Sequence, residues 1–146
     1  MSRSLIAEVS VESAEAEGEL QRLRQQHGGL VVQMACLKIS PSARVVRMIA
    51  EQTLRARRSG ALLASKPEVD LLLRLAGTSQ ISEAIERTGH QALGKRILVA
   101  AGPAEDVDEL RRLLAKDKRY RLIEGEALGA EGLMMVEKAA LLGTRL

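Results

Sequence analysis

The sequence predicts a single α/β (α+β) domain spanning residues 1–146, in which a small mixed sheet of about four strands is flanked by helices. Three observations predict this class. First, the chain has 146 residues, 46% of them hydrophobic, which is enough for one core that hides about two thirds of the surface. Second, short β-type runs alternate with helical segments near both ends of the chain. Third, the middle of the chain has only helical signals, which favours a layered structure with a central helical block.

The first part of the chain predicts a strand, a helix and a second strand. The segment "SLIAEVSV" (4–11) is rich in β-branched residues and predicts a strand. Ser13 is a suitable N-cap for a helix through Gln26, because the acidic residues that follow it suit the positive end of a helix. The segment "LVVQMACLKI" (30–39) is more continuously apolar, so we expect a strand covered on both faces.

Three helices follow in the central block. Ser40 and Pro41 provide a cap and a first turn for the first helix, and Gly60 ends it. Ser65 and Glu68 have the spacing of a capping box at the start of the second helix.

A compact turn joins the second and third of these helices. Gly77 is placed to end the Leu-rich second helix, and Thr78 or Ser79 can cap the third. The third helix is expected to run through Thr88 and to end at Gly89. A Gly-Thr-Ser turn of this kind would let a nucleotide approach the backbone closely.

The last part of the chain repeats the strand-helix-strand order and adds a helix. Residues 96–102 and 119–125 predict strands. Residues 103–117 predict a helix with its acids first and its bases last, the order that the helix dipole favours. Residues 131–142 predict a final helix ended by Gly143.

Composition excludes several classes of site. Cys36 is the only cysteine, which excludes an intramolecular disulfide and a thiolate metal cluster. Tyr120 is the only aromatic residue, so platforms for stacking bases are missing. His27 and His90 lie far apart beside glycines at predicted helix ends, which favours a structural role over that of a general base. We therefore expect a protein that is not an enzyme and has no catalytic residue, metal or cofactor.

Two further features bear on location and on an alternative function. No run approaches the roughly 20 apolar residues of a membrane span, and the N-terminal apolar run is too short for a signal peptide, so we expect a cytoplasmic protein. In "GHQALGKR" (89–96) the Gly94–Lys95 pair matches phosphate-loop spacing, but it follows a helix and leads into a strand, the reverse of that motif. A small-ligand or nucleotide-binding regulatory domain that uses this turn is the alternative hypothesis.

The positive charge is concentrated in one region. Residues 41–66 contain six basic residues and one acidic residue, a surplus of +5 that exceeds the net charge of +3 for the whole chain. A basic region on a nearly neutral body indicates local contact with phosphates, and a solvated helix face explains the same charges equally well. Without aromatic platforms, nucleic-acid binding would depend on backbone contacts and a few specific base or ribose contacts.

The final helix is unusually apolar. It leaves only Glu137 and Lys138 as strongly polar interior positions, whereas an amphipathic surface helix has a wider polar face. Burial in the protein's own core or contact with a partner would explain this, and we favour the partner. The same surface makes a homodimer of the isolated chain plausible.

The segment "KPEVDLLLRLAGTSQISEAIERTG" (66–89) resembles the kinase-binding subunit of the KEOPS complex, the relatives of the PRPK-binding protein. That family has a Leu-rich helix with an acid-x-Leu-Leu-x-x-x-Ala/Ser-Gly pattern, then Thr-x-Gln-Ile and a helix ending at Gly. The matching residues are Asp70, Leu72, Leu73, Ala76, Gly77, Thr78, Gln80, Ile81, Ala84 and Gly89. The short chain is more similar to archaeal than to eukaryotic members.

The resemblance implies a non-catalytic adaptor for the threonylcarbamoyladenosine (t6A) modification of tRNA. Members of the family bind the small atypical protein kinase of the complex through their C-terminal helix and hold the CCA end of tRNA. By this resemblance, the kinase would contact Leu133, Val136, Ala140 and Leu141. The tRNA-binding residues would be Arg55, Arg57, Arg58, Lys66, Gly77, Thr78, Gln80 and Ile81.

Overall fold

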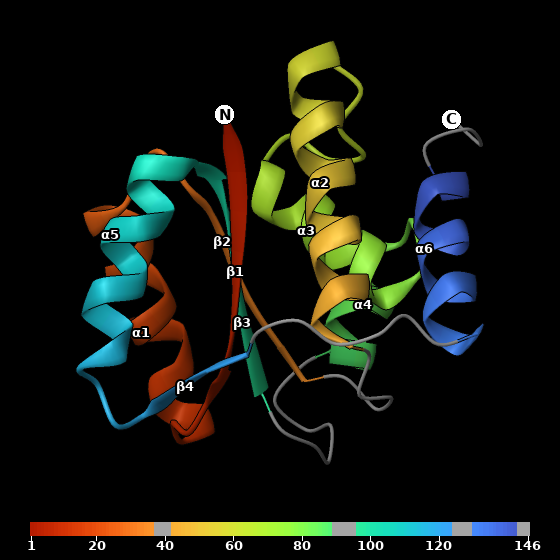
Figure 1. Ribbon diagram of the computed structural model, residues 1–146. Helices are drawn as coiled ribbons and strands as arrows, with labels where there is room; N and C mark the ends of the chain where they lie inside the picture. Colours follow the sequence, from red (N-terminus) through yellow and green to blue (C-terminus); the bar gives the residue numbers. More distant parts are fainter. Residues whose placement is uncertain (37–41, 89–95, 124–129, 143–146) are drawn as a thin grey trace.

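The computed structural model describes residues 1–36, 42–88, 96–123 and 130–142 (Figure 1). Within them the elements are β1 (Ser2–Val9), α1 (Ser13–Gln26), β2 (Val31–Cys36), α2 (Ala43–Ser59), α3 (Pro67–Ala76), α4 (Ile81–Thr88), β3 (Arg96–Pro103), α5 (Ala104–Ala115), β4 (Tyr120–Ile123) and α6 (Ala130–Leu142). The fold class and the order of elements predicted from the sequence are confirmed.

The four strands form one sheet in the order β2-β3-β1-β4. All three neighbouring pairs are antiparallel, with Ala7 of β1 opposite Leu98 of β3 and Leu122 of β4. The expectation of a mixed sheet is therefore wrong, because the two strand-helix-strand units interleave. Each unit has a strand of the other unit between its own two strands, so every neighbour runs in the opposite direction. This is the split β-α-β arrangement, with α2, α3 and α4 inserted between the units.

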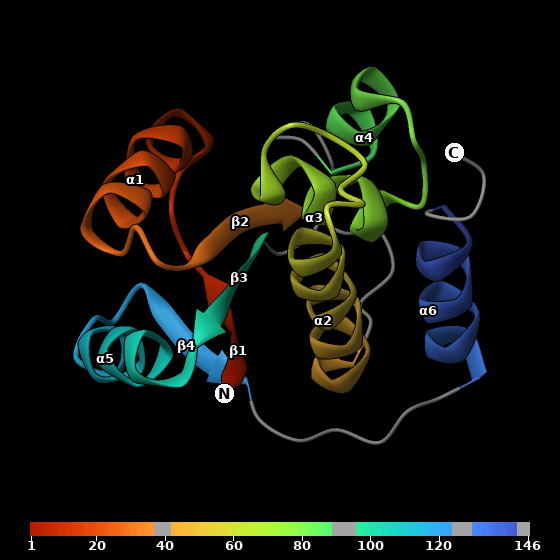
Figure 2. The same ribbon diagram turned by 90° about the horizontal axis from the view of Figure 1, so that it is seen from above.

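Helices cover both faces of the sheet. Viewed from above, α1 and α5 lie on one face, α2 and α3 lie on the other, and α6 lies outside α2 and α3 (Figure 2). The alternation of side chains along β1 serves both layers, since Leu5 and Ala7 pack under α1 and α5 while Ile6 packs under α2. All six residues of β2 are buried, as expected for a strand covered on both sides.

Two predicted helix starts differ from the structure by one or two residues. α1 begins at Ser13 itself, and its N-cap position is Glu12, which makes no side-chain cap. The N-cap of α2 is Ser42 rather than Ser40, and its Oγ accepts a hydrogen bond from the backbone N–H of Val45 (3.3 Å). The predicted Ser40–Pro41 start lies outside the described residues.

The predicted capping box of Ser65 and Glu68 is wrong. α3 begins with Pro67 in its first turn, and the N-cap residue Lys66 makes no side-chain cap. Proline suits this position because its fixed φ is already helical and it has no N–H to leave unsatisfied. Pro67 thus accounts for the start of α3, and the cation of Lys66 remains on the surface.

Candidate nucleic-acid interface

The turn between α3 and α4, residues 77–81, is called the elbow. Gly77 has φ of +71°, in the left-handed region. Its N–H donates to the carbonyl oxygens of Leu73 (2.9 Å) and Arg74 (3.3 Å), and the N–H of Thr78 donates to that of Leu73 (3.2 Å). These bonds form a Schellman motif, in which a residue with a Cβ would cost about 1–2 kcal/mol. The turn itself therefore requires glycine, as the sequence predicted.

Thr78 fixes the start of α4. Its buried hydroxyl accepts a hydrogen bond from the backbone N–H of Gln80 (3.2 Å) and donates one to the Glu83 carboxylate (2.7 Å). Of the two predicted caps, Thr78 is thus the one that bonds to the backbone in the turn. Gln80 and Ile81 are the exposed residues at the end of the elbow where α4 begins. Both are accessible to a ligand, whereas Thr78 is not.

Two cations that do not belong to the predicted site lie against the elbow. A Cβ placed on Gly77 would lie 3.2 Å from Cε and 3.5 Å from Nζ of Lys138, a residue of α6. Nη1 of Arg87 donates to the carbonyl oxygens of Ala76 (3.0 Å) and Gly77 (3.4 Å). In this arrangement the Lys138 side chain lies over Gly77, in the space where the sequence predicts the close approach of a nucleotide to the backbone.

A buried ion pair connects the helices behind the elbow. Asp70 is 0% exposed and accepts hydrogen bonds from Arg74 Nε (2.8 Å), Thr53 Oγ1 (2.6 Å) and the backbone N–H of Leu63 (2.9 Å). Arg74 in turn donates through Nη1 to the carbonyl oxygen of Ala139 in α6 (3.2 Å). The acidic position of the sequence motif thus has a structural role, since it holds α2, α3 and α6 together.

Arg55, Arg57, Arg58 and Lys66 lie where α2 ends and α3 begins, and together they are called the basic end. All four are exposed. Glu51 approaches two of them, at 3.8 Å from Arg55 Nε and 3.6 Å from Arg58 Nη2. Within the described chain, the side chains of Arg57 and Lys66 have no hydrogen bond or ion pair. These cations are therefore available to an anionic partner.

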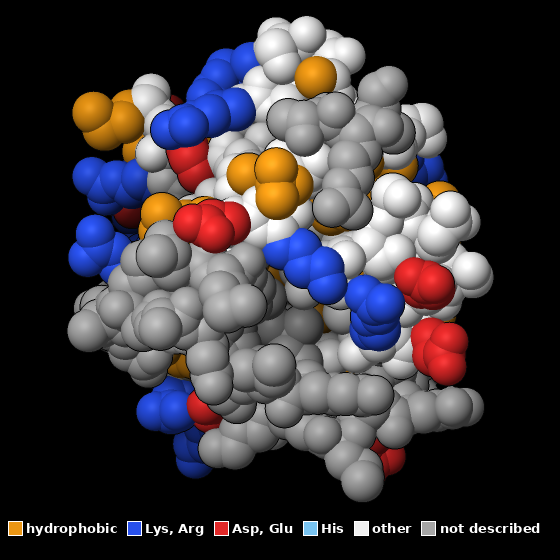
Figure 3. Space-filling model, turned by 90° about the vertical axis from the view of Figure 1, so that its right-hand side faces the viewer, with side chains coloured by type: hydrophobic (Ala, Val, Ile, Leu, Met, Phe, Trp, Pro, Cys, Tyr) orange, Lys and Arg blue, Asp and Glu red, His pale blue; other side chains and the backbone are white. Residues whose placement is uncertain are grey.

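The structure does not bring the basic end and the elbow together. They lie at opposite ends of α3, whose ten residues span about 15 Å at 1.5 Å per residue. The side of the molecule that carries α6 is not uniformly basic, because basic, acidic and hydrophobic side chains are interspersed there (Figure 3). The predicted site is thus two separate groups of residues.

Helix α6 turns one face to the body of the protein. Ala139 and Leu142 are buried, Val136 packs against the same core, and Gln52 donates to the carbonyl oxygen of Val136 (3.1 Å). Ala140 and Leu141 face outward, and Leu141 is 50% exposed. The predicted partner surface is therefore divided, because Val136 belongs to the inner face. The side chain of Leu133 lies outside the described residues.

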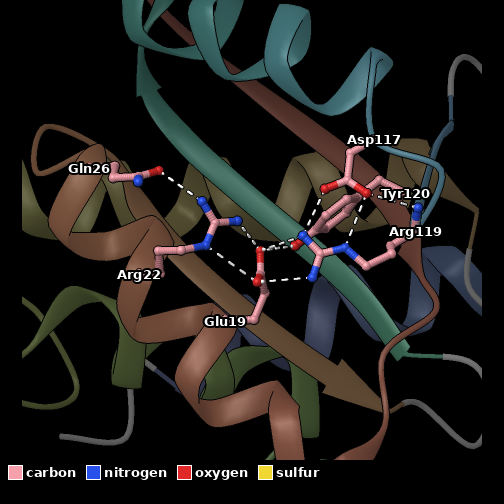
Figure 4. Close-up of polar contacts among 6 residues, drawn as sticks. All are labelled: Glu19, Arg22, Gln26, Asp117, Arg119 and Tyr120. Carbon is pink, nitrogen blue, oxygen red and sulfur yellow. Dashed lines mark hydrogen bonds and ion pairs between the residues drawn. The ribbon is translucent and has the colours of Figure 1, made fainter.

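A second polar cluster, shown in Figure 4, joins α1 to β4 on the other face of the sheet. The Tyr120 hydroxyl donates to Oε1 of Glu19 (2.8 Å), Arg119 lies 3.2 Å from Oε2, and Arg22 also pairs with this carboxylate. Burial, followed by the hydrogen bond to Glu19, raises the pKa of Tyr120 above its usual range. Burial works against the charge of Glu19, but the hydrogen bonds from Arg22 and Tyr120 outweigh it and lower its pKa.

These shifts do not prepare the cluster for proton transfer near neutral pH. The tyrosine stays protonated and the glutamate stays ionised, which is the pairing that their hydrogen bond requires. Arg119 is held further by Asp117 (2.8 Å), and Gln26 bonds to Arg22 (3.0 Å). We interpret the cluster as a structural clasp between α1 and β4.

Several sequence predictions lie outside the described residues, including Gly89, His90 and the Gly94–Lys95 turn. His27 lies at the C-cap of α1, as predicted, and Cys36 is buried. In the described ranges, no group of three or more His, Cys, Asp or Glu side chains could hold a metal ion. No described helix combines the length and apolar character needed to cross a membrane.

Comparison of the chain with models of known protein families gave no match. Comparison with curated proteins gave no match either.

Proposed function

We propose that this protein is a non-catalytic adaptor of the KEOPS type, which binds the small atypical kinase of that complex and recruits tRNA through its 3′ CCA end. The proposal starts from the sequence resemblance of residues 66–89. The structural observation that supports it best is the basic end, which has four exposed cations where α2 ends and α3 begins, with Glu51 within 4 Å of two of them, Arg55 and Arg58. Such a local basic surface attracts the phosphates of a nucleic acid.

The separation of the two groups favours an extended ligand over a small one. About 15 Å of α3 lies between the elbow and the basic end. A strand stacked as in duplex DNA advances about 3.4 Å per nucleotide, so at most roughly four or five nucleotides bridge this length. A 3′ end at the exposed Gln80 and Ile81 would place upstream phosphates near Arg57 and Lys66. A mononucleotide could engage only one of the two groups.

A titration with tRNA tests this proposal. Fluorescence anisotropy would compare intact tRNA with the same tRNA lacking CCA, at several salt concentrations. Contact with about three phosphates predicts a log–log salt slope of roughly −2 to −3. Loss of CCA is expected to weaken binding by as much as the double variant Arg57→Glu/Arg58→Glu does.

A matched control has the same change of charge on the opposite face of the sheet. Arg112→Glu/Lys118→Glu alters two exposed cations on α5 and on the turn after it. We expect it to leave tRNA affinity nearly unchanged. Equal losses of tRNA affinity in both double variants would mean that the basic end attracts tRNA only non-specifically. A wild-type chain that does not bind tRNA at all would refute the recruiting role.

A further inference from the structure

The position of Lys138 connects the two surfaces of the proposed adaptor, the outer face of α6 and the elbow. Lys138 belongs to α6, the helix proposed to meet the kinase, yet its side chain lies over Gly77 in the elbow. Cδ and Cε are 3.3 and 3.2 Å from the position that a Gly77 Cβ would take, so the stem packs on the turn while the residue itself stays exposed. The ammonium group is thereby held at the elbow surface.

The backbone of α6 is fixed at the same place. Arg74 donates to the carbonyl oxygen of Ala139, the residue after Lys138, and Arg74 is itself held by buried Asp70. The Ala139 side chain is 0% exposed against α2 and α3. The position of Lys138 therefore depends on how α6 packs on the body of the protein. The packing of α6 depends in turn on α3, the helix that ends at the elbow.

A second cation completes this surface from α4. Arg87 reaches back to the carbonyl oxygens of Ala76 and Gly77, and Glu83 lies 3.5 Å from its Nη2. Since the guanidinium bonds to the turn through one nitrogen and is exposed, the elbow has two cations from different helices, Lys138 and Arg87, of which Arg87 is paired with Glu83. Neither cation lies within the sequence motif's own Gly-Thr-x-Gln-Ile segment.

We propose that Lys138, together with Arg87, contacts RNA bound at the elbow, and that this contact makes RNA binding and the seating of α6 thermodynamically coupled. The inference rests on the proposed function, since it assumes that RNA occupies the elbow. RNA that binds Lys138 favours the seated position of α6 and so orders the outward face that carries Ala140 and Leu141. By linkage, a partner that holds α6 in this position must strengthen RNA binding by the same factor.

The test uses the full-length chain and intact tRNA with two readouts. Lys138→Met removes the ammonium group but keeps an unbranched stem to pack on Gly77. We expect it to weaken tRNA binding about two- to fivefold, the range of one exposed ion pair, and to make the salt slope less negative by about one. Lys118→Met, which neutralises an exposed lysine beyond α5, is the control and should change neither quantity.

Hydrogen exchange supplies the second readout. In the wild type, saturating tRNA is expected to slow amide exchange in residues 137–142, and in Lys138→Met this slowing should be lost. Equal affinity for both proteins with unchanged α6 exchange would overturn the inference and leave the recruiting role intact. Weaker binding without any change in α6 exchange would keep the contact and overturn the coupling. Absence of binding by the wild type would instead refute the proposed function, and this inference with it.

Discussion

Removing the carboxylate of Asp70 should greatly lower the free energy of unfolding, although the carboxylate itself is a small group. Asp70→Ala deletes the hydrogen bonds from Thr53, Leu63 and Arg74 and leaves the guanidinium of Arg74 unpaired at 5% exposure. Breaking a buried pair from one side costs about 3–5 kcal/mol. A domain of this kind is stable by about 5–15 kcal/mol in total, so a substantial fraction of its stability would be lost.

Urea denaturation followed by circular dichroism measures this loss, and a double-mutant cycle identifies its cause. Arg74→Met keeps most of the side-chain volume, and Asp70→Ala/Arg74→Met leaves no charge uncompensated. We expect the double variant to cost less than the sum of the two single variants by at least about 1 kcal/mol. In a thermal scan, Asp70→Ala should lower Tm by roughly 6–20 °C.

An exposed pair with the same spacing provides the control. Glu51 and Arg55 are also four residues apart but are 41% and 73% exposed, so Glu51→Ala should cost no more than about 1 kcal/mol. If Asp70→Ala costs as little as Glu51→Ala, or if the two single losses simply add, the buried pair does not hold the helices as we describe.

Three other predictions concern the clasp and the outer face of α6. Tyr120 is the only tyrosine, so near-ultraviolet phenolate absorbance reports its pKa directly. Because folding raises the pKa of Tyr120, this residue contributes to the free energy of unfolding below about pH 10, and the contribution is lost as pH rises through the pKa of the folded state. A chain that forms phenolate near pH 10 while still folded would contradict this. For Glu19, whose pKa folding lowers, the contribution is present above about pH 4.3 and is lost as pH falls through the folded value. Under the proposed function, Leu141→Asp should weaken binding of the small atypical kinase about tenfold or more by calorimetry. Leu113→Asp, equally exposed at 49% on α5, should not. Equal effects would remove α6 from the proposed partner surface.

Local sequence signals predicted the elements and several of their ends. Gly60 and Gly77 end α2 and α3 in the left-handed conformation that their positions predicted. The continuous apolar run of β2 predicted a strand buried on both faces, and the structure has it. These features depend on hydrogen bonds and side-chain periodicity within about one helical turn or a few strand residues, which a single sequence displays directly.

Which surfaces meet depends on long-range packing and could not be predicted from these local signals. Strand-helix-strand order does not reveal that the two units interleave, so the antiparallel sheet was not predictable from it. Asp70 and Arg74 are an ordinary i, i+4 pair in the sequence, and their burial depends on α2 and α6 closing over them. Lys138 meets Gly77 across 61 positions of the chain. Such contacts follow from the global packing of apolar faces, because local propensity carries no information about which distant residue fills a given space.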